Sequence, residues 1–372
     1  MNNIKHIVVL AVVLPAIQGL TEQIPGRWSV EQAQAWKKEN GWRVGCNYIP
    51  ANAVNQLEMW QADTFDPKTI DKELALAEGL GFNSLRVYLH DLLWQQDQQG
   101  FLKRMDTFLS ICDSHGIKVM FVFFDSCWDP NPKPGKQKEP PPHVHNPGWL
   151  QSPGVAILGD PAKYDSLKGY VTGVVSHFKD DPRILAWDVF NEPDNMNDNS
   201  YANDELANKP EFARQLLEKS VGWIREIRPA QPLTSAPWWG DWSSDEKLAP
   251  VQKAQLENSD VISFHCYDGA NVMRERIEAL KRFDRPILCS EYMARSSGST
   301  FEIILPILKQ ENVSAYSWGF VAGKTQTQYS WDSWLKKYTT EPDLWFCDIY
   351  RPDGTAYDKS EVALIKKLTG KK

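Results

Sequence analysis

Short apolar runs alternate along this chain with longer segments in which apolar positions recur at helical spacing. Several of the runs are apolar at nearly every position, which is typical of strands buried on both faces of a parallel sheet. The runs predict eight strands, at 44–48, 84–88, 117–124, 183–190, 232–236, 261–265, 287–291 and 315–318. A helical pattern follows each strand, at 69–80, 101–115, 161–178, 203–227, 244–256, 271–283, 301–309 and 360–368.

Eight strand-helix pairs with no intervening linker predict one (β/α)8 barrel of the TIM type, formed by residues 20–372. Two long segments, 125–160 and 319–345, interrupt the alternation and are rich in proline, glycine or aromatic residues. Ordered loops of this length inside a compact domain are usually functional. We therefore expect long βα loops to form an active-site cleft, and the polar segment 20–41 to pack under the barrel.

The N-terminus differs from the rest of the chain. Lys5 precedes an apolar run at 7–17, and Gln18 and Gly19 follow it, which resembles an export signal. We expect residues 1–19 to be a signal peptide and the protein to be secreted or periplasmic, with a buried N-terminal helix as the alternative. The run is short for a membrane span, so we expect none in the mature chain.

Composition narrows the range of partners. The chain is 42% hydrophobic and 24% charged, with a net charge of −7 at pH 7, and it has no basic patch suited to nucleic acid. Cysteine and histidine do not occur at zinc-ligand spacing, and the cysteines suggest no disulfide framework. We therefore expect no metal and no cofactor. Oligomeric state is left open.

Two predicted strands end in a glutamate. Glu192 lies in the segment Asn191-Glu192-Pro193, directly after the fourth strand, and Glu291 ends the seventh. In a parallel barrel both side chains lie at the rim that carries the chemistry. Glycoside hydrolysis requires two such carboxyl groups, one as proton donor and one to attack or stabilise the anomeric carbon.

Residues two apart on a strand share a face, and this parity brings further polar side chains to the same rim. Asp188 has the parity of Glu192 but lies deeper, which indicates an ion partner inside the barrel. The rim residues are Arg86, Tyr88, His90, His265, Tyr267 and, at the end of the eighth strand, Trp318.

The chain contains 16 tryptophans, and indole rings stack on the apolar faces of sugars. Those in or after loops at the rim are the best candidates for a cleft: Trp128, Trp239, Trp318 and Trp331. His143 and His145 lie in the long loop after the third strand, and we expect both to face solvent.

These residues resemble the retaining β-glycosidases of clan A, and within it the cellulase-like glycoside hydrolase family 5. The resemblance covers residues 41–368. A tripeptide such as Asn-Glu-Pro occurs by chance, whereas the ordered set is specific. The set comprises Arg86, Asn191-Glu192-Pro193, His265 with Tyr267, Glu291, Trp318 and the segment 348–357.

The resemblance implies roles. Glu192 is expected to be the acid/base, with a raised pKa, and Glu291 the nucleophile, kept ionised by Arg86 and Tyr267. Asn191 is expected to bind the sugar 2-hydroxyl, and His265 is expected to lie beside the acid/base. Trp318 is expected to form the floor of the subsite on the non-reducing side of the cleaved bond.

The chain departs from the family pattern at Asp125, where family 5 enzymes usually carry a histidine at the end of the third strand. We expect His90 from the neighbouring strand to substitute.

The sequence thus predicts a secreted retaining β-glycoside hydrolase acting on a β-linked oligo- or polysaccharide. Endo-acting cleavage of a glucan or mannan is slightly favoured over exo-acting cleavage. The alternatives are a non-catalytic glycan-binding barrel and a metal-dependent barrel hydrolase. A metal-dependent hydrolase is expected to carry His-x-His on the first strand, and this chain has no such pair there.

Overall fold

The computed structural model describes residues 25–372, so the predicted signal peptide at 1–19 lies outside the described residues. All strand pairs are parallel, and the strands follow one another in the order β5-β4-β3-β2-β1-β8-β7-β6. The strands are β1 Val44–Asn47, β2 Ser84–Tyr88, β3 Lys118–Asp125, β4 Ile184–Asn191, β5 Leu233–Thr234, β6 Ile262–His265, β7 Ile287–Tyr292 and β8 Ser314–Ser317.

The ends of this sheet, β5 and β6, lie against each other. The backbone N–H of Asp260 donates to the carbonyl of Leu233 over 2.8 Å, and the hydroxyls of Thr234 and Ser263 lie 2.6 Å apart. The eight strands therefore form a nearly closed barrel, and the predicted (β/α)8 fold is confirmed.

The helices surround the barrel between successive strands. They are α1 Val30–Asn40, α2 Gln56–Trp60, α3 Pro67–Leu80, α4 Asp91–Gln96, α5 Gln98–Ser114, α6 Val155–Leu158, α7 Asp165–Phe178, α8 Lys209–Ile227, α9 Pro250–Asn258, α10 Ala270–Lys281, α11 Phe301–Gln310 and α12 Lys359–Thr369. Four single-turn 3-10 helices are η1 Pro161–Lys163, η2 Asp245–Lys247, η3 Arg295–Ser297 and η4 Trp331–Trp334. The short α2, α4 and α6, which the sequence pattern did not predict, lie in the loops after the first three strands.

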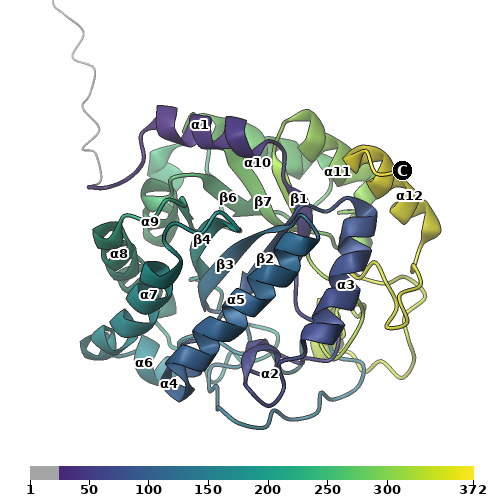
Figure 1. The fold of residues 1–372 in the computed structure, drawn as a ribbon, viewed down its shortest axis with the longest axis horizontal. Helices are drawn as coiled ribbons and strands as arrows, with labels where there is room; N and C mark the ends of the chain where they lie inside the picture. The colour runs from purple at the N-terminus through teal and green to yellow at the C-terminus, as the bar shows by residue number, and fades with distance from the viewer. Residues whose placement is uncertain (1–24) are drawn as a thin grey trace, which may run out of the picture.

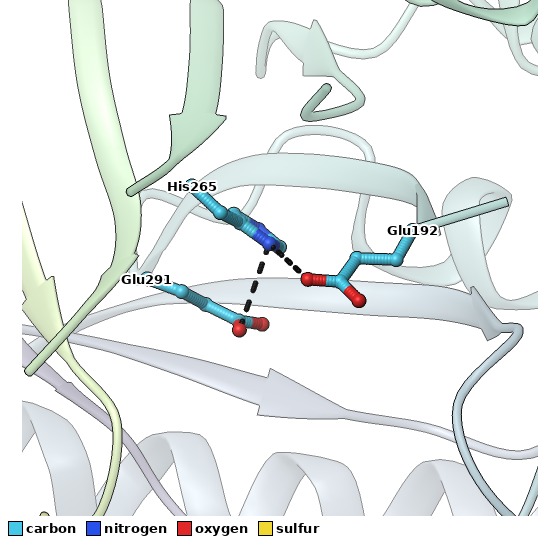
Figure 2. Close-up of side chains that lie close together, drawn as sticks. All are labelled: Glu192, His265 and Glu291. Carbon is cyan, nitrogen blue, oxygen red and sulfur yellow. Dashed lines mark hydrogen bonds and ion pairs between the residues drawn. The ribbon is translucent and has the colours of Figure 1, made fainter. Parts of the chain in front are cut away.

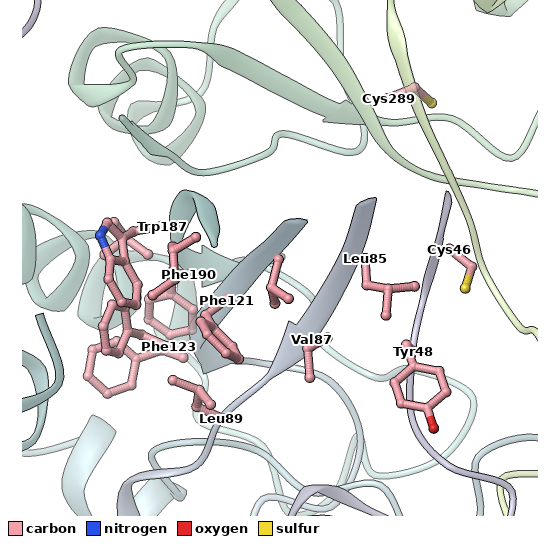
Figure 3. Close-up of a cluster of buried hydrophobic side chains, with 14 of the residues drawn as sticks. Cys46, Tyr48, Leu85, Val87, Leu89, Phe121, Phe123, Trp187, Phe190 and Cys289 are labelled. Carbon is pink, nitrogen blue, oxygen red and sulfur yellow. The ribbon is translucent and has the colours of Figure 1, made fainter. Parts of the chain in front are cut away.

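The main core fills the space between the strands and the helices (Figure 3). Leu85 and Val87 of β2 point outward into it, whereas Arg86 between them points into the barrel. Trp187 of β4 stacks on Phe123 of β3 with ring centroids 5.4 Å apart. Because every other residue of these strands is buried in this shell, the intervening side chains are left to build the barrel interior and the site.

Helix α1 closes the end of the barrel opposite α2, α4 and α6 (Figure 1). Its N-cap Ser29 accepts a hydrogen bond from the backbone N–H of Gln32, and Trp36 packs against the small inner cluster that contains Met120, Leu185 and others. For residues 25–41, the described part of the segment 20–41, the expected packing under the barrel is confirmed. Within residues 25–372, no helix has both the length and the apolar character needed to cross a bilayer.

Candidate active site

Glu192 is positioned by the end of a completely buried strand. All eight residues of β4 are buried, and the chain turns at Glu192 with a φ of 41°. This left-handed conformation is uncommon for a residue with a side chain and is concentrated at functional sites. The turn and the following Pro193 end the strand, and the Glu192 side chain remains 8% exposed at the barrel mouth.

Three donors surround the Glu192 carboxylate. Nδ1 of His265 lies 2.8 Å from Oε1, while Asn195 Nδ2 and the Cys127 thiol lie 2.6 and 3.3 Å from Oε2. Burial raises the pKa of Glu192, but these hydrogen bonds, led by that from His265, outweigh burial and hold the pKa below its ordinary value. The expected raised pKa of Glu192 is therefore wrong for this arrangement of the site.

The His265 ring is suited to both protonation states of Glu192. With its proton on Nδ1 the ring donates to the carboxylate, and with its proton on Nε2 the ring accepts from the carboxylic acid. Nε2 is buried and has no hydrogen-bond partner among residues 25–372. One contact can thus be kept while Glu192 gains or loses its proton.

Glu291 has a different environment. Arg86 Nη1 and the Tyr88 hydroxyl donate to Oε1 over 2.6 and 2.7 Å, and the Tyr267 hydroxyl donates to Oε2 over 2.6 Å. Burial, followed by the charge of Glu291, raises the pKa of Tyr267 well above its ordinary value, so the phenol keeps the proton that it donates. Glu291 thus accepts hydrogen bonds from two phenols and from a buried cation, which are charge-assisted contacts.

The two carboxyl groups lie close together. Figure 2 shows the His265 ring between them, and one carboxylate oxygen from each glutamate and one nitrogen of the ring lie within 4.8 Å of one another. Retaining glycosidases hold their carboxyl groups about 5 to 5.5 Å apart, and inverting ones about 6.5 to 9.5 Å. The spacing fits the retaining class.

The same three residues form the one cluster in the described part of the chain whose ligand atoms could hold a metal ion. All four carboxylate oxygens, however, already accept hydrogen bonds from protein donors, and one donor is the cation Arg86. The arrangement is suited to positioning two carboxyl groups for catalysis rather than to binding a cation.

Asn191 is fixed on both sides of its amide. Its Oδ1 accepts from Arg86 Nη2 over 2.8 Å, and its Nδ2 donates to Asp125 over 2.9 Å. Asp125 also accepts from the indole N–H of Trp149 over 2.7 Å, and burial raises the pKa of Asp125 to about 6. At the position of the family histidine, this chain therefore has a carboxyl group that orients Asn191.

A cavity of about 480 Å³ opens over the two glutamates, within the range typical of small-molecule sites. It lies at the ends of the strands and between the long loops. Its lining includes these predicted residues: Glu192, Glu291, Asn191, Tyr267, Trp128, Trp239, Trp318 and Trp331.

Comparison with known proteins identifies the family. The family model of cellulase (glycosyl hydrolase family 5) matches residues 45–337, most of the chain. The chain belongs to glycosyl hydrolase family 5. It is therefore a glycoside hydrolase, and the resemblance noted from the sequence is confirmed.

Solved structures similar to this family 5 enzyme share its fold. A family 5, subfamily 18 enzyme from Streptomyces cattleya in complex with GlcNAc is 14% identical, with a TM-score of 0.60, over 89% of this chain and 80% of that one. The exo-β-1,4-mannosidase Op5Man5 from Opitutaceae bacterium strain TAV5 is 19% identical, with a TM-score of 0.59, over 88% of this chain and 60% of that one. The endo-β-1,4-mannanase from Thermotoga petrophila is 15% identical, with a TM-score of 0.56, over 90% and 77%. No curated protein matches the chain.

Most of the predicted residues of the family 5 site converge, but His90 does not line the cavity. Its side chain is fully buried, and its Nδ1 accepts from the backbone N–H of Leu92 as the N-cap of α4. The strand β2 ends at Tyr88, so the strand parity that placed His90 at the rim no longer applies. His90 does not replace the missing histidine, and Asp125 has a different role.

Sequence reasoning missed two side chains that contact the glutamates or Asn191, and a third was only partly predicted. Strand parity placed Tyr88 at the rim with Arg86, but its hydrogen bond to Glu291 was not predicted. Asn195 and Cys127 lie in loops, where no periodicity indicates direction. The six cysteines are all buried and free, so Cys127 contacts Glu192 as a thiol.

Proposed function

We propose that this protein is a retaining β-glycoside hydrolase that cleaves its substrate by double displacement. In the first step a Glu291 oxygen attacks the anomeric carbon, the bond from that carbon to the leaving sugar breaks, and Glu192 gives its proton to the departing oxygen. In the second step Glu192 takes a proton from water, the water oxygen bonds to the same carbon, and Glu291 leaves as a carboxylate.

The contrasting surroundings of the two carboxyl groups, which have one oxygen each within 4.8 Å of the other, carry this proposal. Glu291 faces a guanidinium and two phenols, which suits a group that must be ionised to attack. Glu192 faces the ring of His265, which can donate or accept, and this suits a group that changes protonation state in each step. Asn191, held by Arg86 and Asp125, is placed to bind the sugar 2-hydroxyl.

The substrate that we propose is a β-linked glucan or mannan, or an oligosaccharide derived from one. Similar solved structures include a β-mannosidase and β-mannanases, so β-1,4-mannosides are the first substrates to test. We further propose that the protein is exported and takes part in polysaccharide breakdown. Cell fractionation with and without residues 1–19 tests export, and retention of the complete chain in the cytoplasm would contradict it.

Product release from a panel of β-glycans and aryl β-glycosides tests the activity, with wild type compared to Glu291→Gln and Glu192→Gln. We expect wild type to cut at least one substrate and both variants to lose nearly all of that activity. Binding of a glycan by wild type without turnover would favour the non-catalytic glycan-binding barrel. Unchanged turnover in Glu291→Gln would remove Glu291 from the mechanism.

A further inference from the structure

The two long loops predicted at 125–160 and 319–345 join into a continuous wall at one side of the cavity. His145 makes three contacts with the second loop. Its backbone N–H donates to the Ser333 hydroxyl over 2.9 Å, and its backbone carbonyl accepts from the Trp334 indole N–H over 2.9 Å. Its ring Nδ1 lies 2.7 Å from the Tyr329 carbonyl oxygen. The Trp128 ring stacks on that of Trp334 with centroids 5.6 Å apart.

The wall extends at both ends beyond these contacts. Trp334 reaches Tyr201 in the loop after β4, with ring centroids 5.5 Å apart. At the other end, Gln326 donates to the Pro141 carbonyl over 2.8 Å and accepts from the backbone N–H of His143. The expectation that His145 faces solvent is wrong, because His145 is 1% exposed. His143 is half-buried, and its ring is bonded to the Tyr329 hydroxyl.

The exposure of the lining residues shows where the cavity opens. The lining residues of the wall, Trp128, His145, Asn146 and Trp331, are buried or half-buried. The exposed lining residues all come from the loops after β4, β5, β6 and β7, and they are Asp198, Asn199, Trp239, Asp268 and Ser297. Solvent therefore enters from the side that faces away from the wall.

The wall lies at the part of the cavity that holds the attacked sugar, and the leaving sugar lies away from it. The leaving sugar must lie beyond Glu192, toward the open side that the exposed residues Asp198 and Trp239 line. The attacked sugar lies over Glu291 and Trp318, and Asn146 of the wall lines a small cavity together with Trp318. A chain extending past the attacked sugar at its non-reducing end meets the wall.

Asn146 has unused hydrogen-bonding capacity at this position. The side chain is 1% exposed, yet its Oδ1 and Nδ2 have no hydrogen-bond partner among residues 25–372. A buried amide without partners is costly, and a sugar hydroxyl supplies both a donor and an acceptor. The backbone φ of 46° is one that asparagine tolerates better than most residues. The Asn146 amide is therefore suited to form its hydrogen bonds with hydroxyl groups of a bound sugar.

From the wall and this amide we infer that the enzyme is exo-acting: it removes one sugar at a time from the non-reducing end, and Asn146 binds the hydroxyls of that terminal sugar. This inference rests on the proposed glycosidase function and narrows it. The sequence alone slightly favoured internal cleavage, because the contacts between the two loops are not visible in it.

The test follows wild-type products on mannohexaose and cellohexaose whose reducing ends have been converted to alditols. We expect the first products to be a free monosaccharide and the alditol one sugar shorter. Early release of longer unreduced fragments would overturn the exo inference and leave the glycosidase proposal standing. Failure to cut these and all aryl β-glycosides would overturn the glycosidase proposal itself.

A blocked substrate and a matched pair of variants test the role of Asn146. A 4,6-O-benzylidene group on the terminal sugar is expected to abolish cleavage, whereas an endo-acting enzyme would still cut. Asn146→Gly removes the amide while keeping the left-handed backbone accessible, and we expect roughly tenfold lower kcat/KM. The control is Asn312→Gly, at a φ of 54° outside the cavity, which should match wild type. An Asn146→Gly variant as active as wild type would remove Asn146 from sugar binding.

Discussion

Arg86 serves two buried carboxylates at once: its guanidinium lies 2.6 Å from Glu291 and 2.8 Å from Asp188. The side chains of Arg86 and Asp188 are fully buried, and that of Glu291 is 5% exposed. The cation therefore pairs with Asp188 below the site, and in the proposed mechanism it also holds the nucleophile Glu291. Removing it leaves both carboxylates unpaired in a region of low dielectric, where unpaired charge is costly.

Replacing Arg86 with methionine should therefore affect both folding and activity. We expect Arg86→Met to lower the free energy of unfolding by about 3 to 5 kcal/mol, the usual cost of breaking a buried ion pair, and to abolish turnover. Urea denaturation and initial rates measure the two effects. Asp188→Asn, which keeps the Arg86 contact to Glu291, should retain much more activity. Wild-type stability in Arg86→Met would contradict this account.

Tyr267 tests the environment of the nucleophile without changing the charge. Its hydroxyl donates to Glu291 Oε2 over 2.6 Å. A hydrogen bond to a charged group contributes about 1.5 to 3 kcal/mol, so Tyr267→Phe should lower kcat roughly ten- to a hundredfold. As a control, Tyr316→Phe removes a barrel hydroxyl that contacts Ser84 outside the cavity, and kcat should stay near wild type. Equal kcat in wild type and Tyr267→Phe would contradict the proposed role of the Tyr267 hydroxyl in supporting Glu291.

The pH profile tests the hydrogen bonds to Glu192. The hydrogen bond from Asn195 is one of those that hold the pKa of Glu192 low, and the acid must be protonated for the first step. Asn195→Ala removes this stabilisation of the carboxylate, so the pKa rises and the alkaline limb of kcat/KM should move up by about one pH unit. Asn208→Ala, at an exposed position at the start of α8, should leave the limb in place. Movement of the alkaline limb to lower pH in Asn195→Ala would contradict the claim that Asn195 stabilises the Glu192 carboxylate.

Trp239 tests the open side of the cavity. It is 46% exposed, yet its indole N–H donates to Asp194, which follows the acid/base by two residues. A ring that is exposed and held in place provides a surface for the leaving part of a glycan. Trp239→Ala should raise KM for oligosaccharides about two- to tenfold, from a stacking contribution of about 0.5 to 1.5 kcal/mol, and leave aryl glycosides unaffected. The control is Leu344→Ala, at an exposed apolar position outside the cavity. An equal change in KM in both variants would contradict the claim that the Trp239 ring binds the leaving part of a glycan.

The fold and the two glutamates could be predicted because both depend on local patterns. Apolar runs of strand length give the barrel, and residues at the carboxyl ends of parallel strands share one rim, which brings Glu192 and Glu291 together from distant segments. Strand parity also placed Arg86 correctly. His90 and Tyr267 each lie two residues past the end of a strand, where parity no longer fixes side-chain direction, and of the two only Tyr267 reaches the site.

The loop contacts could not be predicted in the same way. His145 is buried because a loop that follows it by about half of the chain folds against it, and neither loop has a periodic pattern that fixes side-chain direction. The pKa of Glu192 depends on Asn195 and Cys127, which reach it from two different loops. Such properties arise from the assembled site rather than from any one segment.

The anomeric configuration of the first product tests the central claim most directly. Double displacement through Glu291 inverts the anomeric carbon twice, so ¹H NMR of wild type acting on a β-glycoside should show the β-anomer first, followed by slow mutarotation. Initial appearance of the α-anomer would show a single displacement by water and would contradict the assignment of Glu291 as the nucleophile.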